Sequence, residues 1–304
     1  MSNVSSLNLF LTFDCDPADF DSSLRIIGEP GFIHLEKSIP TAIKILNQAS
    51  EMIEKEIKAT FFIRNVSTDS RGRVTPEPWK LHMELWKELI ANGHSLGLHP
   101  HIDVPLTSES DPNFLELVEL MNRDFNSLRL LNEYGRVTRV GGHAYNDLTT
   151  SVLRKTEVQV DSSAIPGRKL GHYESCSNWL EVNNDLKIDW SYPNLEIFDN
   201  DSIYQLAQLP MTTLQRISQP DHRRYIDFSF ESFEDFSFSD FNLVTKVHNV
   251  VAISHPSTLL ENCYWDHATL KFGTENWLNN FMIVVQRLAG IGIEPEFRLL
   301  RHIP

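Results

Sequence analysis

The chain has 304 residues, enough for two average domains or for a single α/β barrel. Its composition, 41% hydrophobic and 22% charged, is that of a globular protein with a sizeable core. The formal net charge of -14 argues against nucleic acid or an anionic membrane surface as the main partner, although it does not exclude a phosphorylated substrate held by a few local arginines.

The N-terminal sequence and the cysteines predict a cytoplasmic protein. The first six residues carry no basic side chain, and the apolar run that follows them is too short for a secretory signal. No apolar stretch approaches the ~18 residues that a membrane span needs. The three cysteines are scattered and form no CxxC pair, which is typical of free thiols in a reducing compartment (Cys15, Cys176 and Cys263).

Strand-like apolar runs alternate with helical patterns, which predicts a parallel sheet built from βα units. The expected strands cover 9–14, 59–64, 94–99, 136–140, 158–161, 206–210 and 249–254, with a last strand near residue 297. The expected helices begin at residue 38, with Pro40 in the first turn, and then cover 79–91, 111–128, a short stretch after 142, and 277–289. A charged loop is expected over 67–78, and an irregular excursion over the site from 162 to about 203.

Two short stretches at strand ends carry pairs of polar side chains. Asp14 and Asp16 end the first strand, and His99 and His101 follow the third. Side chains two residues apart in an extended strand point to the same side, so each pair can face one point. Carboxylate oxygen and imidazole nitrogen together suit a borderline divalent cation, typically zinc.

Five polar residues stand at or just past the C-terminal end of an expected strand: Asp14, His99, Arg139, Asp161 and His255. In a parallel α/β barrel these strand ends converge on one face, where catalytic residues collect. The pattern therefore predicts one site built from residues spread over the whole chain.

These stretches resemble the motifs of the polysaccharide deacetylase (NodB-like, carbohydrate esterase family 4) superfamily, in the same order. The segments that carry the resemblance are 12–16 (TFDCD), 93–99 (GHSLGLH), 139–142 (RVGG), 160–167 (VDSSAIPG) and 253–256 (ISHP). The resemblance covers the chain from about Leu9 to Leu299. It implies a single domain over 1–304 with a distorted, incomplete (β/α) barrel, and hydrolysis of N-acetyl or related amide groups with a divalent metal.

The resemblance also implies a role for each matching residue. Asp14 would be the catalytic base and Arg139 would orient it. Asp16 and His99 would bind the metal, and His255 would be the general acid.

The sequence departs from the family pattern at the second metal histidine. That histidine usually lies four residues after the first, where this chain has Asp103, so His101 and Asp103 are both candidates for the third metal ligand. The family's Asp-Trp motif has a possible counterpart in Asp189-Trp190, deep in the irregular stretch. Asp161, at a strand end, is the better-placed supporting acid.

Three other histidines and Cys15 are not expected to bind the metal. His94 follows a helix-stopping glycine and is expected to make a structural hydrogen bond. His143 and His172 are expected in loops near the site, and Cys15 should point away from both aspartates.

The expected activity is removal of an acetyl or similar acyl group from an amidosugar by a protein that holds one divalent metal, most simply zinc, through Asp16, His99 and His101. A small or lipid-linked sugar precursor of surface polysaccharide, such as O-antigen or capsule, fits a cytoplasmic protein. Two alternatives remain. One is hydrolysis of another C–N bond, in a cyclic amide or imide, and the other is a metal-free barrel that only binds carbohydrate.

Overall fold

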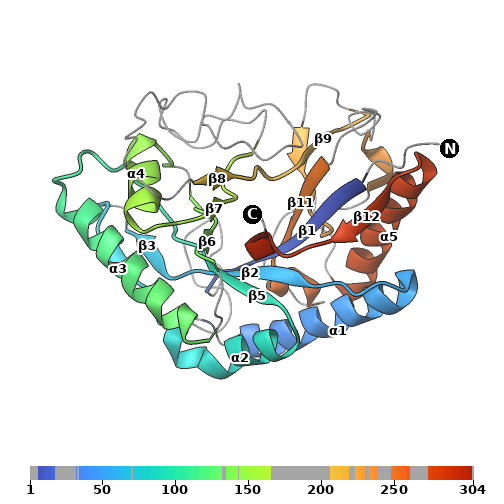
Figure 1. Ribbon diagram of the computed structural model, residues 1–304, viewed down its shortest axis with the longest axis horizontal. Helices are drawn as coiled ribbons and strands as arrows, with labels where there is room; N and C mark the ends of the chain where they lie inside the picture. The colour runs from blue at the N-terminus through green and yellow to red at the C-terminus, as the bar shows by residue number, and fades with distance from the viewer. Residues whose placement is uncertain are drawn as a thin grey trace.

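The structure, a computed structural model, describes residues 6–17, 32, 34–69, 71–131, 135–142, 144–165, 206–218, 223–229, 233–237, 248–260 and 273–302. Its centre is an eight-stranded sheet in the order β11-β1-β2-β5-β6-β7-β8, with β12 also paired to β1 (Figure 1). The strands are β1 Ser6–Cys15, β2 Ala59–Ile63, β5 Ser95–Leu98, β6 Val137–Thr138, β7 Val160–Asp161, β8 Ala207–Gln208, β11 His248–Ser254 and β12 Glu294–Phe297. Every pairing within this sheet is parallel, as the alternation of strands and helices predicted.

Helices form the outer layer around the sheet (Figure 1). They are α1 Leu35–Ile53, α2 Met83–Ala91, α3 Pro112–Arg129, α4 Asp147–Lys155 and α5 Thr274–Gly290. Two of their starts follow ordinary capping rules. Asp111 accepts a hydrogen bond from the N–H of Asn113 ahead of α3, and Asn146 forms a capping box with Thr149 at α4.

The sheet is curled, and the chain after β8 forms hydrogen bonds near both of its ends. The N–H of Leu209 donates to the carbonyl of Asp161 in β7, and the N–H of Thr212 donates to the carbonyl of Val251 in β11. The same short segment therefore reaches both edges. The predicted α/β fold, an incomplete (β/α) barrel, is confirmed.

Burial on both faces explains why the central strands are almost wholly apolar. All residues of β2 and β5 are buried, as expected for parallel strands covered by helices. On one face, Phe13 of β1 stacks on Phe61 of β2 with ring centroids 4.8 Å apart, and Trp277 of α5 packs against Phe13. This packing fixes the relative register of β1 and β2, whose C-terminal ends carry the site.

Three local expectations need correction. Helix α1 begins at Leu35, not at residue 38, because Leu35 and Ile39 are both buried and extend its apolar face; Pro40 thus lies inside the helix. The expected loop over 67–78 contains an antiparallel hairpin, β3 Val66–Thr68 and β4 Val74–Pro76. The expected helix over 79–91 begins as one 3-10 turn before α2.

A second small antiparallel pair, β9 Thr213–Gln215 and β10 Arg223–Tyr225, comes after β8. Most of the expected excursion over 162–203 lies outside the described residues, as do His143, His172, Asp189 and Trp190. Among the helices that the structure describes, none is long and apolar enough to cross a membrane.

Candidate metal centre

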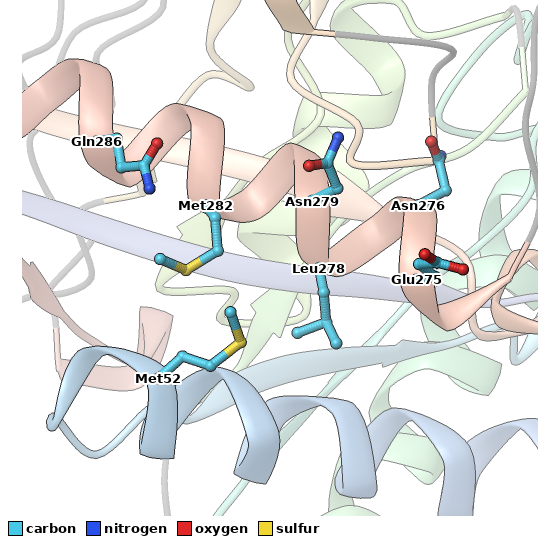
Figure 2. Close-up of a pocket in the computed structure, with 7 residues that line it drawn as sticks. All are labelled: Met52, Glu275, Asn276, Leu278, Asn279, Met282 and Gln286. Atoms are coloured by element: carbon cyan, nitrogen blue, oxygen red, sulfur yellow. The ribbon is translucent and has the colours of Figure 1, made fainter.

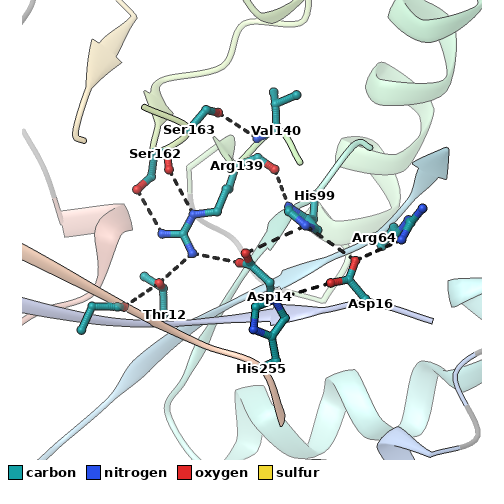
Figure 3. A network of polar contacts seen from close by, with 11 residues as sticks. Thr12, Asp14, Asp16, Arg64, His99, Arg139, Val140, Ser162, Ser163 and His255 are labelled. Atoms are coloured by element: carbon teal, nitrogen blue, oxygen red, sulfur yellow. Dashed lines mark hydrogen bonds and ion pairs between the residues drawn. The ribbon is translucent and has the colours of Figure 1, made fainter. Parts of the chain in front are cut away.

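The C-terminal end of β1 places Asp14 and Asp16 on the same side of the sheet. Parallel pairing sets the last residue of β1, Cys15, beside Ile63 of β2, and Ile63 beside Leu98 of β5. The next residue along β5 is His99, so its ring projects over the same strand ends. The Nε2 atom of His99 lies 3.6 Å from Asp16 Oδ1 and 3.9 Å from Asp14 Oδ2 (Figure 3).

The tautomer of His99 is set by its other nitrogen. Nδ1 lies 2.7 Å from the backbone carbonyl of Arg139, and a carbonyl can only accept a hydrogen bond. Nδ1 must therefore carry the proton, which leaves the lone pair of Nε2 pointing toward the two carboxylates. A metal-binding histidine is commonly fixed in this way.

His101 completes a group of three potential metal ligands. One ligand atom from each of Asp16, His99 and His101 lies within 4.8 Å of the other two. The backbone of His101 is held on both sides, because its N–H donates to Val66 of β3 and it forms a bridge with Gly141. Its ring therefore stays on the side of His99, as an extended path through Pro100 predicts.

Asp103 lies behind His101 in this arrangement. Its Oδ2 is 3.5 Å from Nδ1 of His101, which leaves Nε2 as the ring atom that can face a metal. The backbone N–H of Asp103 donates to Thr68 Oγ1 at 2.8 Å. Of the two sequence candidates for the third ligand, His101 is the one that falls within the group in the described part of the chain.

Gly141 leaves the space that the two imidazoles occupy. A Cβ added there would lie 2.3 Å from Cδ2 of His101 and 2.8 Å from Cε1 of His99. Real Cβ atoms do not approach carbon that closely. The glycine is thus required by the approach of the two rings rather than by its backbone conformation.

Arg139 connects Asp14 with His99, because it forms hydrogen bonds with both residues. Its Nη1 donates to Asp14 Oδ1 at 2.9 Å and to Thr12 Oγ1 at 2.8 Å, and its Nε donates to the carbonyl of Ser162 at 3.0 Å (Figure 3). The guanidinium also lies over the ring of Phe62, 4.6 Å from its centroid. Since Oδ1 of Asp14 is engaged by Arg139, Oδ2 is the oxygen that faces His99.

His255 lies on the opposite side of the aspartates from His99 (Figure 3). It comes directly after β11, and its Nε2 is 3.8 Å from Asp16 Oδ2. Asp227, which the sequence pattern did not indicate, bridges to Ile253 of β11 and lies near enough for its charge to interact with His255. Burial raises the pKa of the Asp227 carboxyl, and the charge of His255 opposes that rise.

Asp161 occupies a separate buried network. Its carboxylate accepts hydrogen bonds from Tyr145 at 2.9 Å, from Gln208 at 2.8 Å and from the hydroxyl of Ser163. The Ser163 hydroxyl in turn accepts the N–H of Val140 at 2.8 Å. Burial raises the pKa of Asp161 in spite of these donors. Through Ser163, this network holds the backbone of Val140, the residue after Arg139. The hydrogen bonds named here are not made to Asp14 or Asp16.

Arg64 is a second residue near the group that the sequence analysis did not place in the site. It comes directly after β2, and its Nη1 lies 3.4 Å from Asp16 Oδ1. It stands at a strand end, so the rule that found the other site residues would also have found it.

The electrostatics of the group favour a charged Asp16 beside a neutral His99. Burial alone would raise the pKa of Asp16, but the positive charges of His99, His101 and His255 when these rings are protonated, and of Arg64, outweigh it and hold that pKa well below its usual range. Burial lowers the pKa of His99, although Asp14 and Asp16 oppose the shift. These are the protonation states in which both residues can bind a cation.

Exposure increases from one side of the group to the other. The side chains of His99 and Asp14 are 4% and 5% exposed, whereas those of Asp16 and His101 are 16% and 23% exposed. A ligand would therefore approach from the side of Asp16 and His101.

Two other features lie apart from this group. His94 is buried near the start of β5, where its Nδ1 accepts the N–H of Ala59 at 3.2 Å, the structural role expected for it. A pocket of about 760 Å³ lies between α1 and α5 on the outside of the barrel, where Met52 faces Leu278 and Met282 (Figure 2). None of the residues that line this pocket belongs to the group around Asp16.

Comparison with known proteins gives a distant structural likeness. No protein-family model matches the sequence, and no curated protein matches it either. Among solved structures, one similar chain is the crystal structure of a mutant of a CE4 family pseudoenzyme with restored enzymatic activity. The TM-score is 0.34 at 12% identity, and the match covers 55% of this chain but 47% of that chain, about half its length. A likeness this low carries no argument, so a function for this chain has to be argued from its own residues.

Proposed function

We propose that this protein is a metal-dependent hydrolase that removes an acetyl or similar small acyl group from the amide nitrogen of a sugar. The observation that supports this best is the meeting of one carboxylate and two imidazoles at Asp16, His99 and His101, with Asp14 beside them. Catalytic zinc sites commonly use three protein ligands of these types and keep a further position open.

The donor set fits such a metal. His99 and His101 each have Nδ1 against an oxygen acceptor, which leaves Nε2 for the metal, and Asp16 contributes a charged carboxylate. When bound, a divalent cation at this position polarises a substrate carbonyl and lowers the pKa of a coordinated water.

Asp14 acts as the general base in this proposal. Arg139 holds Oδ1, so Oδ2 is the oxygen that takes the proton of the attacking water. The fixed guanidinium keeps this carboxylate in one orientation, which lowers the cost of reaching the transition state.

His255 acts as the general acid from the other side of the aspartates. Its Nε2 faces the group and would give its proton to the departing amine nitrogen. The carboxyl group of Asp227 lies near enough for its charge to interact with this ring.

The substrate class is tested by a product screen. Zinc-loaded protein is incubated with small N-acyl amidosugars, with sugars on lipid carriers, and with cyclic amides and imides, and the released acid is identified. Acetate or formate from an amidosugar, absent with Asp14→Asn protein that still holds zinc, is the expected result. Ring opening of a cyclic amide without release of an acid from amidosugars would favour the other C–N hydrolase activity instead.

A further inference from the structure

Arg64 stands beside the candidate metal ligands for a reason set by the sheet register. Because Cys15 pairs with Ile63 and Ile63 with Leu98, the next residues in line are Asp16, Arg64 and His99. The backbone N–H of Arg64 donates to the carbonyl of Cys15 at 3.1 Å, which continues the β1–β2 pairing by one residue. Its side chain thus leaves the sheet at the same strand ends as the side chains of Asp16 and His99.

The side chain of Arg64 is held along one edge. Its Nε donates to Ser67 Oγ at 2.8 Å and lies 3.9 Å from Glu77 Oε1, and the Ser67 hydroxyl itself donates to Glu77. Both anchors belong to the β3–β4 hairpin and the residue after it. A guanidinium fixed in this way loses little further conformational entropy when it binds a ligand.

The other edge of the guanidinium remains available. Nη1 makes a long contact of 3.4 Å with Asp16, and Nη2 has no partner among the residues that the structure describes. The side chain is 17% exposed, on the side of the group from which a ligand would approach. Arginine forks of this kind match the two oxygens of a carboxylate or phosphate group.

The charges around Arg64 also favour binding of an anion. A divalent cation bound by Asp16 takes up the charge of that carboxylate, which leaves Glu77 as the acid that pairs with Arg64. In a chain with a net charge of -14, an anionic substrate also needs a local cation to overcome the general repulsion.

We infer that Arg64 binds an anionic oxygen group of the substrate, a carboxylate or a phosphate, next to the amide that is cleaved. The inference rests on the proposed function and narrows its substrate class to acidic amides, such as an N-acyl sugar that also carries an acid or a phosphate. A purely structural Arg64 would hold the hairpin and Asp16 in place without any preference for charged ligands.

The test compares hydroxamic acids, which bind zinc directly, on zinc-loaded protein by isothermal titration calorimetry. Acetohydroxamic acid has a neutral methyl tail. Succinomonohydroxamic acid carries a carboxylate at the end of a short tail. A hydroxamic acid with a phosphonate at the end of its tail provides the phosphate arm. The wild type is expected to bind one of the charged probes at least about 10-fold more tightly than acetohydroxamic acid, the range of a charge-assisted hydrogen bond.

Arg64→Gln should remove that preference while its dissociation constant for acetohydroxamic acid stays within about 3-fold of wild type, which shows that the zinc site is intact. Arg73→Gln is the matched control, because Arg73 lies on the same hairpin, is 70% exposed and pairs with Asp69. It should keep the wild-type preference.

Three results would overturn the inference. Equal binding of charged and neutral probes by the wild type would do so, and so would a preference that survives Arg64→Gln. If wild-type protein binds no hydroxamic acid at all, the proposed zinc hydrolase is wrong and the role of Arg64 falls with it. Stronger binding of the carboxylate probe or of the phosphonate probe identifies which anion the site takes.

Discussion

Arg139 and Asp14 form an ion pair of 2.9 Å in which the side chains are only 1% and 5% exposed. The pair joins the end of β6 to the end of β1, strands that are not neighbours in the sheet. The carbonyl of Arg139 also accepts from His99 Nδ1, so one residue orients both the proposed base and a proposed metal ligand.

We therefore expect Arg139 and Asp14 to be strongly coupled in stability. Arg139→Gln and Asp14→Asn each disturb a buried pair, and loss of the arginine should lower the free energy of unfolding by about 3 kcal/mol, the usual cost of an uncompensated buried charge. In a double-mutant cycle followed by urea unfolding, the double variant should lose clearly less than the two single losses added together. Additive losses would show that the pair does not act as a unit.

Gly141 should be essential for zinc binding although it offers no ligand. Gly141→Ala places a Cβ 2.3 Å from the His101 ring, so the two imidazoles must move apart, and zinc affinity should fall at least about 10-fold. Gly290→Ala is the matched control, because a Cβ there meets no atom within 4 Å. Zinc dissociation constants for both variants, measured with a chelator competition assay, decide the matter. Unchanged affinity in Gly141→Ala would mean that the imidazoles do not meet at this glycine.

His101 and Asp103 should differ in their effect on zinc binding. His101→Ala removes a proposed ligand and should weaken binding by more than about 100-fold. Asp103→Ala removes only the carboxylate behind the ring and should cost about 10–100-fold, as is typical of groups that orient ligands. Dissociation constants are compared in one buffer. The reverse order would make Asp103 the ligand and restore the four-residue spacing of the family pattern.

Much of the fold could be predicted because parallel strands are short apolar runs that end in polar residues. The runs before Asp14 and His255 indicated both the strands and the positions of the site residues. The start of α1 could not be read from the sequence in this way, since the packing of Leu35 decides where that helix begins.

Apart from Arg64, which stands at an expected strand end, the features that were missed depend on tertiary structure. Asp227 belongs to a stretch with no strand pattern and reaches the site through its bridge to Ile253. The β3–β4 hairpin has strands of three residues each, too short to show alternation. For Asp161 the strand-end position was visible, but its hydrogen bonds to Tyr145 and Gln208 could not be read from the sequence.

His94 should make the protein less stable at mildly acidic pH. Burial and the nearby charge of Lys58 lower its pKa from 6.5 to about 4. Between these values the unfolded chain binds a proton that the folded chain does not, so stability is retained above pH 6.5 and lost as the pH falls toward 4. This residue alone should cost about 2 kcal/mol between pH 7 and pH 5.

Urea unfolding of wild type and His94→Asn at both pH values isolates this contribution. Asparagine can still accept the N–H of Ala59 but does not titrate, so the variant should lose about 2 kcal/mol less than wild type between pH 7 and pH 5. An identical pH dependence in the two proteins would show that His94 is not the group responsible.

The most direct test of the proposed centre is zinc stoichiometry in wild type, His99→Ala and His82→Ala. His82 lies before α2, where its Nδ1 is 3.7 Å from Glu36, and it is not part of the ligand group, so it serves as the matched histidine control. After zinc loading and desalting, elemental analysis should find about one zinc per chain in wild type and His82→Ala and almost none in His99→Ala, because a three-ligand site rarely survives the loss of one ligand. Full zinc occupancy in folded His99→Ala would contradict a metal centre at Asp16, His99 and His101.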